Sequence, residues 1–297
     1  MSAPHRAGFV ALLGRPNAGK STLLNALLGQ KLSIVSPKPQ TTRHKLLGII
    51  NGNDYQLCLL DTPGWLDEAQ DGLQKTLIQM ARSAARDDAD VIVLVVEPTP
   101  PAAADLESLR SSLRGDKPLV LVVNKCDLRE APAIEAAKTG WAALNPVKVH
   151  AVSAMKATGV AALRADLIAL LPESPAFYDK TQASDRWERF FATEFIRETI
   201  FENLHEEVPH ACAVEIERYK ERPGKPDEIN ATIYVERAGQ KPILLGKKGA
   251  MIRTLTEESR RKIEAFTGRK ADLEIWIKIR ANWRKDAGAL RELGYTL

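Results

Sequence analysis

A glycine-rich segment at residues 14–21 has the pattern G-x-x-x-x-G-K-[ST] and separates an apolar run from a helical pattern. It reads Gly14, Arg15, Pro16, Asn17, Ala18, Gly19, Lys20 and Ser21, and Thr22 follows. Glycines let a backbone approach a ligand more closely than a Cβ would permit, and free N–H groups at a helix N-terminus attract phosphate. In this pattern Lys20 reaches the β- and γ-phosphates of a nucleotide, and Ser21 offers its hydroxyl to Mg²⁺. The segment therefore predicts a nucleotide phosphate site that uses Mg²⁺.

A second segment, Asp61-Thr62-Pro63-Gly64, ends a continuous apolar run. Ligands gather outside the carboxyl ends of strands in open α/β sheets. Asp61 is therefore expected to hold Mg²⁺ through water, and the amide of Gly64 to sense a γ-phosphate. Alone, the pattern D-x-x-G is more often a plain turn, and its position after the phosphate segment favours the site.

A third segment, Asn124-Lys125-Cys126-Asp127, follows the apolar run at residues 119–123. A carboxylate at Asp127 can accept hydrogen bonds from N1–H and the 2-amino group of guanine, which adenine cannot supply. A helix cap or a local turn is the alternative interpretation. Ser153-Ala154-Met155, after the last predicted strand, would place a backbone N–H on the guanine carbonyl. Together the two segments predict recognition of guanine.

These four segments, in this order and each at a predicted strand end, resemble the Ras-like family of P-loop GTP-binding domains (G domains). The resemblance implies that the chain binds GTP and GDP and hydrolyses GTP, with a mobile loop around residues 39–43. It also implies that Thr42, and with less weight Thr41, gives its hydroxyl to Mg²⁺ when a γ-phosphate is present. A plain loop or strand-edge role is the alternative for both threonines. The implied metal ligands are Ser21, Thr42 and Asp61, and the implied catalytic residues are Asn17, Lys20, Thr42 and Gly64.

Trp65 is a departure from that family, because Ras-like enzymes carry a water-positioning glutamine at this place. An indole cannot orient water as an amide does, so hydrolysis must use another group or be slow unaided. In GTPases with an apolar residue here, an asparagine of the phosphate segment can hold K⁺. Asn17 matches that asparagine, so the resemblance implies K⁺ as a second candidate cation beside Mg²⁺.

A sheet must bring these segments together, and the first 170 residues alternate short apolar runs with helical periodicity. Strands are predicted at residues 9–13, 46–50, 55–60, 91–96, 119–123 and 147–152. Helices are predicted at residues 20–28, 72–86, 102–113, 133–144 and 159–171. This alternation predicts an α/β fold with a mostly parallel sheet covered on both faces. The strands at 46–50 and 55–60 are expected to pair as an antiparallel hairpin at one edge of this sheet.

The pattern changes after Pro172-Glu173-Ser174-Pro175, which closes a helix and starts an extended stretch. We therefore predict a first domain at 1–173, a linker at 174–184 and a second domain at 185–297. The second domain should hold a helix at 185–204 capped by Ser184 or Asp185, strands at 211–220 and 228–237, two short helices around a Gly-Lys-Lys-Gly turn, a strand at 271–279 and a tail. The order α-β-β-α-α-β predicts an α+β domain.

That turn, Gly246-Lys247-Lys248-Gly249, lies between apolar helical residues and is followed by Arg253. The glycines would let a sugar–phosphate backbone come close, and the lysines add charge. This resembles the KH arrangement, which clamps about four nucleotides of single-stranded nucleic acid, and the element order resembles the type II KH fold. A plain helix–turn–helix corner is the alternative. The apolar neighbours are expected more in the core than on a base platform: Ile243, Leu244, Leu245, Met251, Ile252 and Leu255.

Charge is uneven although the formal net charge is only +4. Residues 179–236 hold 8 Lys/Arg against 14 Asp/Glu, whereas residues 237–270 hold 10 against 3, which indicates a localised anionic partner. Cys58, Cys126 and Cys212 are scattered without metal-ligand spacing, which argues against a disulfide framework or zinc site. No run approaches the ~20 apolar residues of a membrane span, and the first apolar run is too short for a signal sequence, so we expect membrane association to be peripheral at most.

The combination of both domains with the Pro-Gln-Thr-Thr-Arg loop and Trp65 resembles the Era family of bacterial GTPases over essentially the whole chain. The resemblance implies binding of the 3′ end of 16S rRNA and a role in maturation of the 30S ribosomal subunit. It also implies a cytoplasmic protein, expected to be a monomer, that can associate peripherally with the inner membrane. The alternative is an RNA-binding assembly factor whose nucleotide is mainly structural and whose hydrolysis is incidental.

Overall fold

The computed structural model describes residues 4–65, 68–113 and 116–295. Contacts divide the chain into two compact units. The first contains Met1–Ala69 and Gln74–Asp185, and the second contains Gln70–Leu73 and Arg186–Thr296. No helix within the described ranges is both long and apolar enough to cross a membrane.

The first unit is built on a six-stranded sheet in the order β2-β3-β1-β4-β5-β6. The strands are β1 (Arg6–Leu13), β2 (Leu46–Asn51), β3 (Tyr55–Asp61), β4 (Val91–Val96), β5 (Leu119–Val123) and β6 (Lys148–Ala151). Neighbouring strands are parallel except for β2 and β3, which form an antiparallel pair. The prediction of a mostly parallel sheet with one hairpin is confirmed.

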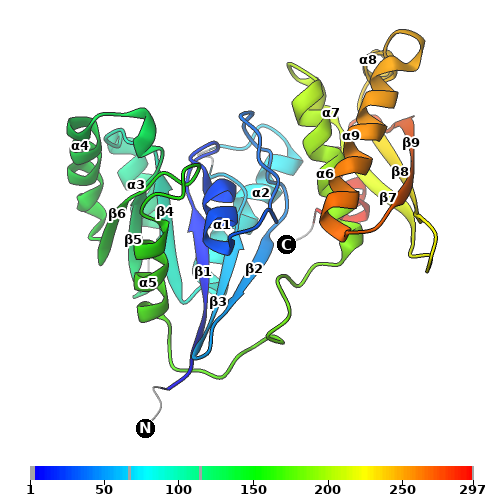
Figure 1. Cartoon of the computed structure of the whole chain (residues 1–297). Helices are drawn as coiled ribbons and strands as arrows, with labels where there is room; N and C mark the ends of the chain where they lie inside the picture. The colour runs from blue at the N-terminus through cyan, green and yellow to red at the C-terminus, as the bar shows by residue number, and fades with distance from the viewer. Residues whose placement is uncertain (1–3, 66–67, 114–115, 296–297) are drawn as a thin grey trace. The chain divides into compact units, whose positions relative to one another are not determined.

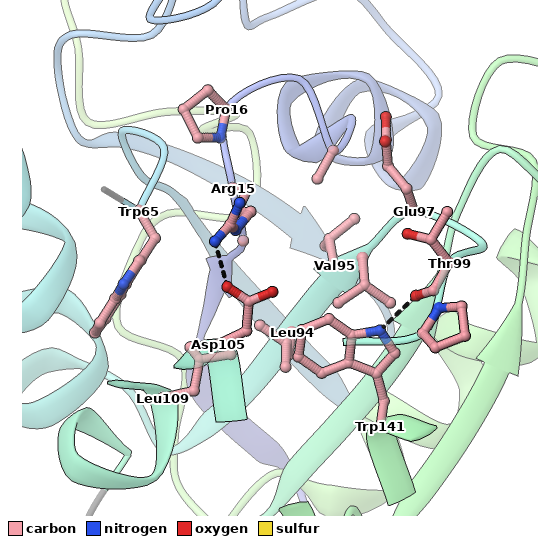
Figure 2. Close-up of a pocket in the computed structure, with 14 residues that line it drawn as sticks. Arg15, Pro16, Trp65, Leu94, Val95, Glu97, Thr99, Asp105, Leu109 and Trp141 are labelled. Atoms are coloured by element: carbon pink, nitrogen blue, oxygen red, sulfur yellow. Dashed lines mark hydrogen bonds and ion pairs between the residues drawn. The ribbon is translucent and has the colours of Figure 1, made fainter. Parts of the chain in front are cut away.

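Helices cover both faces of this sheet. They are α1 (Lys20–Leu28), α2 (Gly72–Ser83), α3 (Ala103–Ser112), α4 (Ala131–Trp141) and α5 (Val160–Leu170). Helices α1 and α5 lie in front of the sheet in Figure 1. A buried cluster that includes Leu94, Leu109 and Trp141 joins β4 to α3 and α4 (Figure 2). The helix predicted to end at residue 86 ends earlier, because a π-helical turn, Ala84–Asp88, follows α2.

The segment predicted as a linker packs along the first unit. The Gln56 side-chain carbonyl accepts the amides of Phe177 and Tyr178 at 2.7 and 3.0 Å. Further along, the amide of Ile49 donates to the carbonyl of Ala183 at 2.9 Å. These contacts fix the path of the segment beside β2 and β3.

The second unit is an α+β domain with a three-stranded sheet in the order β7-β8-β9. Its elements are α6 (Glu188–Asn203), α7 (Val208–Ala211), β7 (Ala213–Lys220), β8 (Asp227–Val235), α8 (Gln240–Leu245), α9 (Ala250–Thr267), β9 (Ala271–Ile279) and α10 (Ala287–Glu292). Strands β7 and β8 are antiparallel, and β8 and β9 are parallel. The predicted order is confirmed, with the short helices α7 and α10 added.

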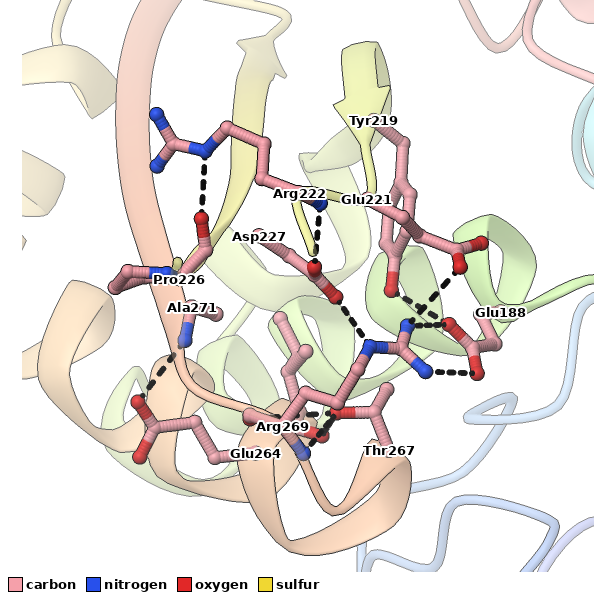
Figure 3. A network of polar contacts seen from close by, with 11 residues as sticks. Glu188, Tyr219, Glu221, Arg222, Pro226, Asp227, Glu264, Thr267, Arg269 and Ala271 are labelled. Atoms are coloured by element: carbon pink, nitrogen blue, oxygen red, sulfur yellow. Dashed lines mark hydrogen bonds and ion pairs between the residues drawn. The ribbon is translucent and has the colours of Figure 1, made fainter. Parts of the chain in front are cut away.

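The first helix of this unit begins later than predicted. It starts at Glu188 after an extended Trp187, and no side chain caps it. Ser184, a predicted cap, instead donates to the carbonyl of Leu47 at 2.6 Å. Figure 3 shows that the Glu188 carboxylate, in the first turn of this helix, accepts hydrogen bonds from the guanidinium of Arg269 and, at 2.9 Å, from the hydroxyl of Tyr219.

Candidate functional site

The glycine-rich segment forms a tight loop between β1 and α1. Gly14 and Gly19 have φ values of +151° and +93°, which side chains rarely adopt. A Cβ on Gly14 would lie 2.2 Å from the Val95 carbonyl oxygen, and one on Gly19 would lie 2.3 Å from the side-chain nitrogen Nδ2 of Asn124. Both positions therefore require glycine, and the loop packs closely against β4 and the Asn124 segment.

Lys20 lies buried beneath this loop. Its ammonium group donates to the carbonyls of Gly14 and Arg15, both at 3.0 Å. Burial lowers the pKa of Lys20 to about 8, while the carboxylate of Asp61 opposes that shift. The loop thus holds a positive group at the start of a helix, where the backbone dipole also favours an anion.

Asp61 is the centre of a buried cluster of oxygen atoms. Its Oδ2 accepts hydrogen bonds from Ser21 at 2.6 Å and from Ser33 at 2.8 Å. The hydroxyls of Ser21 and Thr42 lie 2.8 Å apart. Oδ1 of Asp61 is buried without a hydrogen-bond partner among the described residues, and burial raises the pKa of this carboxyl group. A buried carboxylate oxygen without a donor, beside two hydroxyls, fits a hard cation such as Mg²⁺.

The structure thereby brings together all three residues predicted to ligate the metal. It also separates the two threonine alternatives, because the Thr41 hydroxyl donates to the carbonyl of Lys38 at 2.8 Å rather than facing Ser21. Thr62 donates to the carbonyl of Leu12 at 2.7 Å and supports the backbone. A Cβ on Gly64 would lie 2.7 Å from the Pro16 nitrogen, so this segment contacts the phosphate loop directly.

Sequence reasoning missed Ser33 and the residue that positions it. Asn25, on α1, accepts the amides of Leu32 and Ser33 at 2.9 and 2.8 Å. Its side-chain amide donates to the carbonyl of Ser33 at 2.8 Å. Asn25 therefore fixes the backbone that aims the Ser33 hydroxyl at Asp61. No motif marks these residues, because the contacts depend on the path of a loop.

The segments predicted to recognise guanine meet at the ends of β5 and β6. The buried side chain of Asn124 donates to the carbonyl of Ala18 at 2.9 Å and accepts the amide of Ala154 at 3.0 Å. Asn124 thus ties the phosphate loop to the Ser153-Ala154-Met155 segment. Asp127 is exposed, and a hydrogen bond with Ser153 holds its pKa below the usual range. An ionised acceptor is therefore available at this end of the site.

A cavity of about 480 Å³ lies along the phosphate loop and the loop that carries Thr41 and Thr42, and Asp61, Asn124 and Asp127 are not among its lining residues. Predicted residues that line it are Pro16, Asn17, Gly19, Lys20, Ser21, Thr22, Thr42, Gly64, Lys125 and Met155. Arg15 and Ala18 line a separate cavity, and the Arg15 guanidinium pairs with Asp105 (Figure 2). Trp65 also belongs to that second cavity and to the buried cluster, with the Arg82 guanidinium 5.4 Å from its ring centre.

The Gly-Lys-Lys-Gly turn of the second unit joins α8 to α9. Gly246 and Gly249 have φ values of +70° and +76°, and a Cβ on Gly246 would lie 2.7 Å from the amide nitrogen of Met251. Lys247 and Lys248 are exposed, as is Arg253. The turn therefore presents positive side chains and close backbone to solvent.

The apolar residues around this turn divide into two groups. Leu244 and Leu255 are fully buried, as predicted, whereas Ile243 is 49% exposed and Leu245 is 38% exposed. The expectation of core positions therefore does not hold for Ile243 and Leu245, and the accompanying expectation that some of these apolar residues stay outside the core applies to them. Both side chains are partly open to solvent beside the turn.

Comparisons with known proteins agree with both parts of this geometry. A family model described as "50S ribosome-binding GTPase" matches residues 9–125, and one described as "KH domain" matches residues 207–284. "GTPase Era" of Caldanaerobacter subterraneus subsp. tengcongensis is 41% identical over 296 residues, covering 99% of each chain. "GTPase Era" of Xanthomonas campestris pv. campestris (strain B100) is 42% identical over 302 residues, again covering 99% of each.

Solved structures give the same result. A variant of Aquifex aeolicus Era bound to GDP and AlF₄⁻ superimposes with a TM-score of 0.93 at 32% identity, covering 98% of this chain and 100% of that one. Era in complex with MgGDPNP and nucleotides 1506–1542 of 16S ribosomal RNA superimposes with a TM-score of 0.93 at 33% identity, covering 99% and 100%.

Fold, site and comparisons together define a P-loop GTPase with a Ras-like G domain followed by a KH domain. It is a GTP-hydrolysing enzyme. The chain belongs to the Era family of GTPases.

Proposed function

We propose that this GTPase couples its nucleotide state to binding of the 3′ end of 16S rRNA during maturation of the 30S subunit. The observation that carries the proposal is the agreement over both domains with Era in complex with MgGDPNP and nucleotides 1506–1542 of 16S rRNA. We also propose functional domains at 1–173 and 185–297, joined by residues 174–184. GTP would order the loops around Thr42 and Gly64, and RNA would bias the same equilibrium reciprocally.

Hydrolysis within a single turnover, with and without an RNA of that sequence, tests the coupling. We expect RNA to accelerate the reaction and to bind more tightly with a non-hydrolysable GTP analogue than with GDP. Equal rates and equal affinities would favour the alternative, an assembly factor with a mainly structural nucleotide. Burial of Trp65 favours that alternative over a fast enzyme, because an indole enclosed by apolar residues cannot position the attacking water.

The oxygen cluster around Asp61 supports Mg²⁺ as the cofactor, with Ser21, Thr42 and Asp61 as the residues that hold it. Bound there, Mg²⁺ would neutralise charge on the transferred phosphate. Lys20 would give up its contacts with the loop carbonyls and donate to the phosphates. The two carboxylate oxygens of Asp61 would accept hydrogen bonds from the water and hydroxyl ligands of the Mg²⁺ ion.

Ser33 is expected to strengthen this site by orienting Asp61. Replacing Ser33 by alanine removes one of two hydrogen bonds to Oδ2, so we predict about a three- to tenfold higher Mg²⁺ concentration for half-maximal retention of GDP. Dissociation of a fluorescent GDP analogue across a Mg²⁺ titration measures this. Ser36→Ala is the matched control, because Ser36 accepts an amide of its own loop and does not touch Asp61. An equal effect of both substitutions would contradict the role of Ser33.

We further propose that K⁺ assists hydrolysis and that Asn17 helps to hold it. Asn17 lines the cavity beside Lys20 and Ser21, and its side-chain nitrogen donates to the carbonyl of Pro37 at 2.9 Å. We expect hydrolysis to be at least about tenfold faster in KCl than in NaCl, and Asn17→Ala to abolish the difference. Equal rates in the two salts, unchanged by the substitution, would exclude this role.

Lys247 and Lys248 are proposed to contact the RNA backbone beside Gly246, Gly249 and Arg253. Replacing both lysines by alanine should lower RNA affinity and reduce the slope of log K against log [salt] by about 1.4. Guanine-nucleotide affinity should not change. The double variant Lys138→Ala/Lys148→Ala removes the same charge from the first unit and is the control. An unchanged salt slope in the Lys247/Lys248 variant would contradict the assignment.

The remaining partner and location proposals derive from the family resemblance. They are a cytoplasmic location, peripheral association with the inner membrane and a monomeric state. Sedimentation of the purified chain with anionic vesicles tests the second, and its sedimentation velocity alone tests the third.

A further inference from the structure

A second cavity of about 350 Å³ is lined in part by Gly14, Arg15 and Pro16 of the phosphate loop, and it shares Pro16 and Glu97 with the first cavity. Figure 2 shows Trp65 at one side of it and Trp141 at the other. Leu94 and Leu109 form an aliphatic wall between the two rings. The cavity thus has an apolar wall bounded by two indoles, charged and polar side chains (Arg15, Glu97, Thr99 and Asp105) elsewhere in its lining, and a volume typical of small-molecule sites.

The two indole N–H groups at the cavity differ in their hydrogen bonding. The indole N–H of Trp141 donates to the carbonyl of Thr99 at 3.0 Å. The indole N–H of Trp65 is buried and has no acceptor within the described part of the chain, and Trp65 itself is only 5% exposed. A buried donor without a partner is rare in native structures and indicates that an acceptor is missing.

The charged side chains that line the cavity are paired, and Glu97 among them forms an ion pair with Lys125. The Arg15 guanidinium pairs with the carboxylate of Asp105, which also accepts the amide of Ala102 at 3.2 Å. Because this arginine already faces a carboxylate, the cavity offers no excess positive charge to a phosphate. The arrangement favours an uncharged ligand over a nucleotide.

We propose that this cavity binds a small, uncharged, planar aromatic molecule whose hydrogen-bond acceptor receives the indole N–H of Trp65. Flat rings suit a space bounded by two indoles, and an acceptor would complete the Trp65 N–H, a buried donor that lacks a partner among the described residues. Gly14 and Pro16 also line the cavity, so an occupant would contact the phosphate loop. Occupancy and nucleotide binding therefore influence each other by equal factors.

Quinoline and indole are suitable probes, because they are similar in size but only quinoline carries a ring nitrogen that accepts a hydrogen bond. The full chain, saturated with Mg²⁺ and GDP, is titrated with each while the five tryptophan indole N–H signals are followed by ¹H–¹⁵N NMR. Trp65→Phe identifies the Trp65 signal. We expect quinoline to shift this signal downfield and to bind about three- to tenfold more tightly than indole.

Two variants test whether the shifts come from this cavity. Leu109→Trp fills the cavity and should abolish the shifts. Trp65→Phe keeps an aromatic ring but removes the N–H donor, so quinoline and indole should then bind with equal affinity. If Leu109→Trp fails to fold, the Trp65→Phe comparison still decides. The proposal is overturned if millimolar quinoline leaves the Trp65 signal in place, if both probes bind equally to the unsubstituted chain, or if quinoline acts by displacing GDP.

Discussion

Replacing Asp127 by asparagine should convert a guanine-specific protein into one that prefers xanthine nucleotides. The side chain of Asp127 is 15% exposed, and a hydrogen bond with Ser153 holds its pKa low, so the carboxylate is ionised at neutral pH and can accept two hydrogen bonds from guanine. An asparagine amide presents a donor where guanine also presents one. We expect GDP affinity to fall by about 10²- to 10⁴-fold and XDP affinity to rise.

Calorimetric titration with GDP, XDP and ADP measures this change. Asp54→Asn is the matched control, because Asp54 is an exposed carboxylate in the turn between β2 and β3. The unfolding temperature without nucleotide should be unchanged, since Asp127 lies at the surface. Retention of guanine preference in the Asp127 variant would contradict the assignment of base recognition to this side chain.

Replacing Asp61 by asparagine should have the second large effect, this time on hydrolysis. The substitution keeps the shape of the side chain but removes the charge that supports Mg²⁺ beside Ser21 and Thr42. Loss of several kcal/mol of charge stabilisation corresponds to a rate lower by about 10²- to 10³-fold. Single-turnover hydrolysis at saturating Mg²⁺ and GTP measures it.

The same substitution should not destabilise the nucleotide-free chain. Burial raises the pKa of Asp61 above its ordinary value of 3.8, so the folded state loses stability relative to the unfolded state as pH rises from 3.8 through the raised pKa. A neutral amide avoids this loss. With a chelator present, the Asp61→Asn chain should therefore unfold at the same temperature or higher at pH 7. Asp166→Asn, which removes a surface partner of Lys148, is the control. A lower unfolding temperature confined to Asp61→Asn would show that the carboxylate is structural.

Local sequence was sufficient for the sheet and for the segments at its edge. The strands at 91–96 and 119–123 are continuous apolar runs, and the structure has them with the same bounds. Because parallel strands end at one edge, the segments that follow them had to meet there. The glycines at 14 and 19 were equally predictable from the G-x-x-x-x-G-K-[ST] pattern, and in the structure Val95 and Asn124 leave no space for a Cβ there.

Contacts between distant segments were decided only by the tertiary structure. The position of the Thr42 hydroxyl beside Ser21, the hydrogen bond of Ser33 to Asp61 and the burial of Trp65 all depend on how loops pack at the end of the sheet. The exposure of Ile243 and the contacts of Glu188 with other elements depend likewise on tertiary packing. A motif specifies the backbone and side chains of its own few residues, and so the amino-acid sequence alone determined the phosphate loop, the guanine segments and the KH turn. Which hydroxyl faces Asp61, and which cavity encloses Trp65, follow from packing among residues far apart in the chain, because those contacts form only when the whole core is assembled.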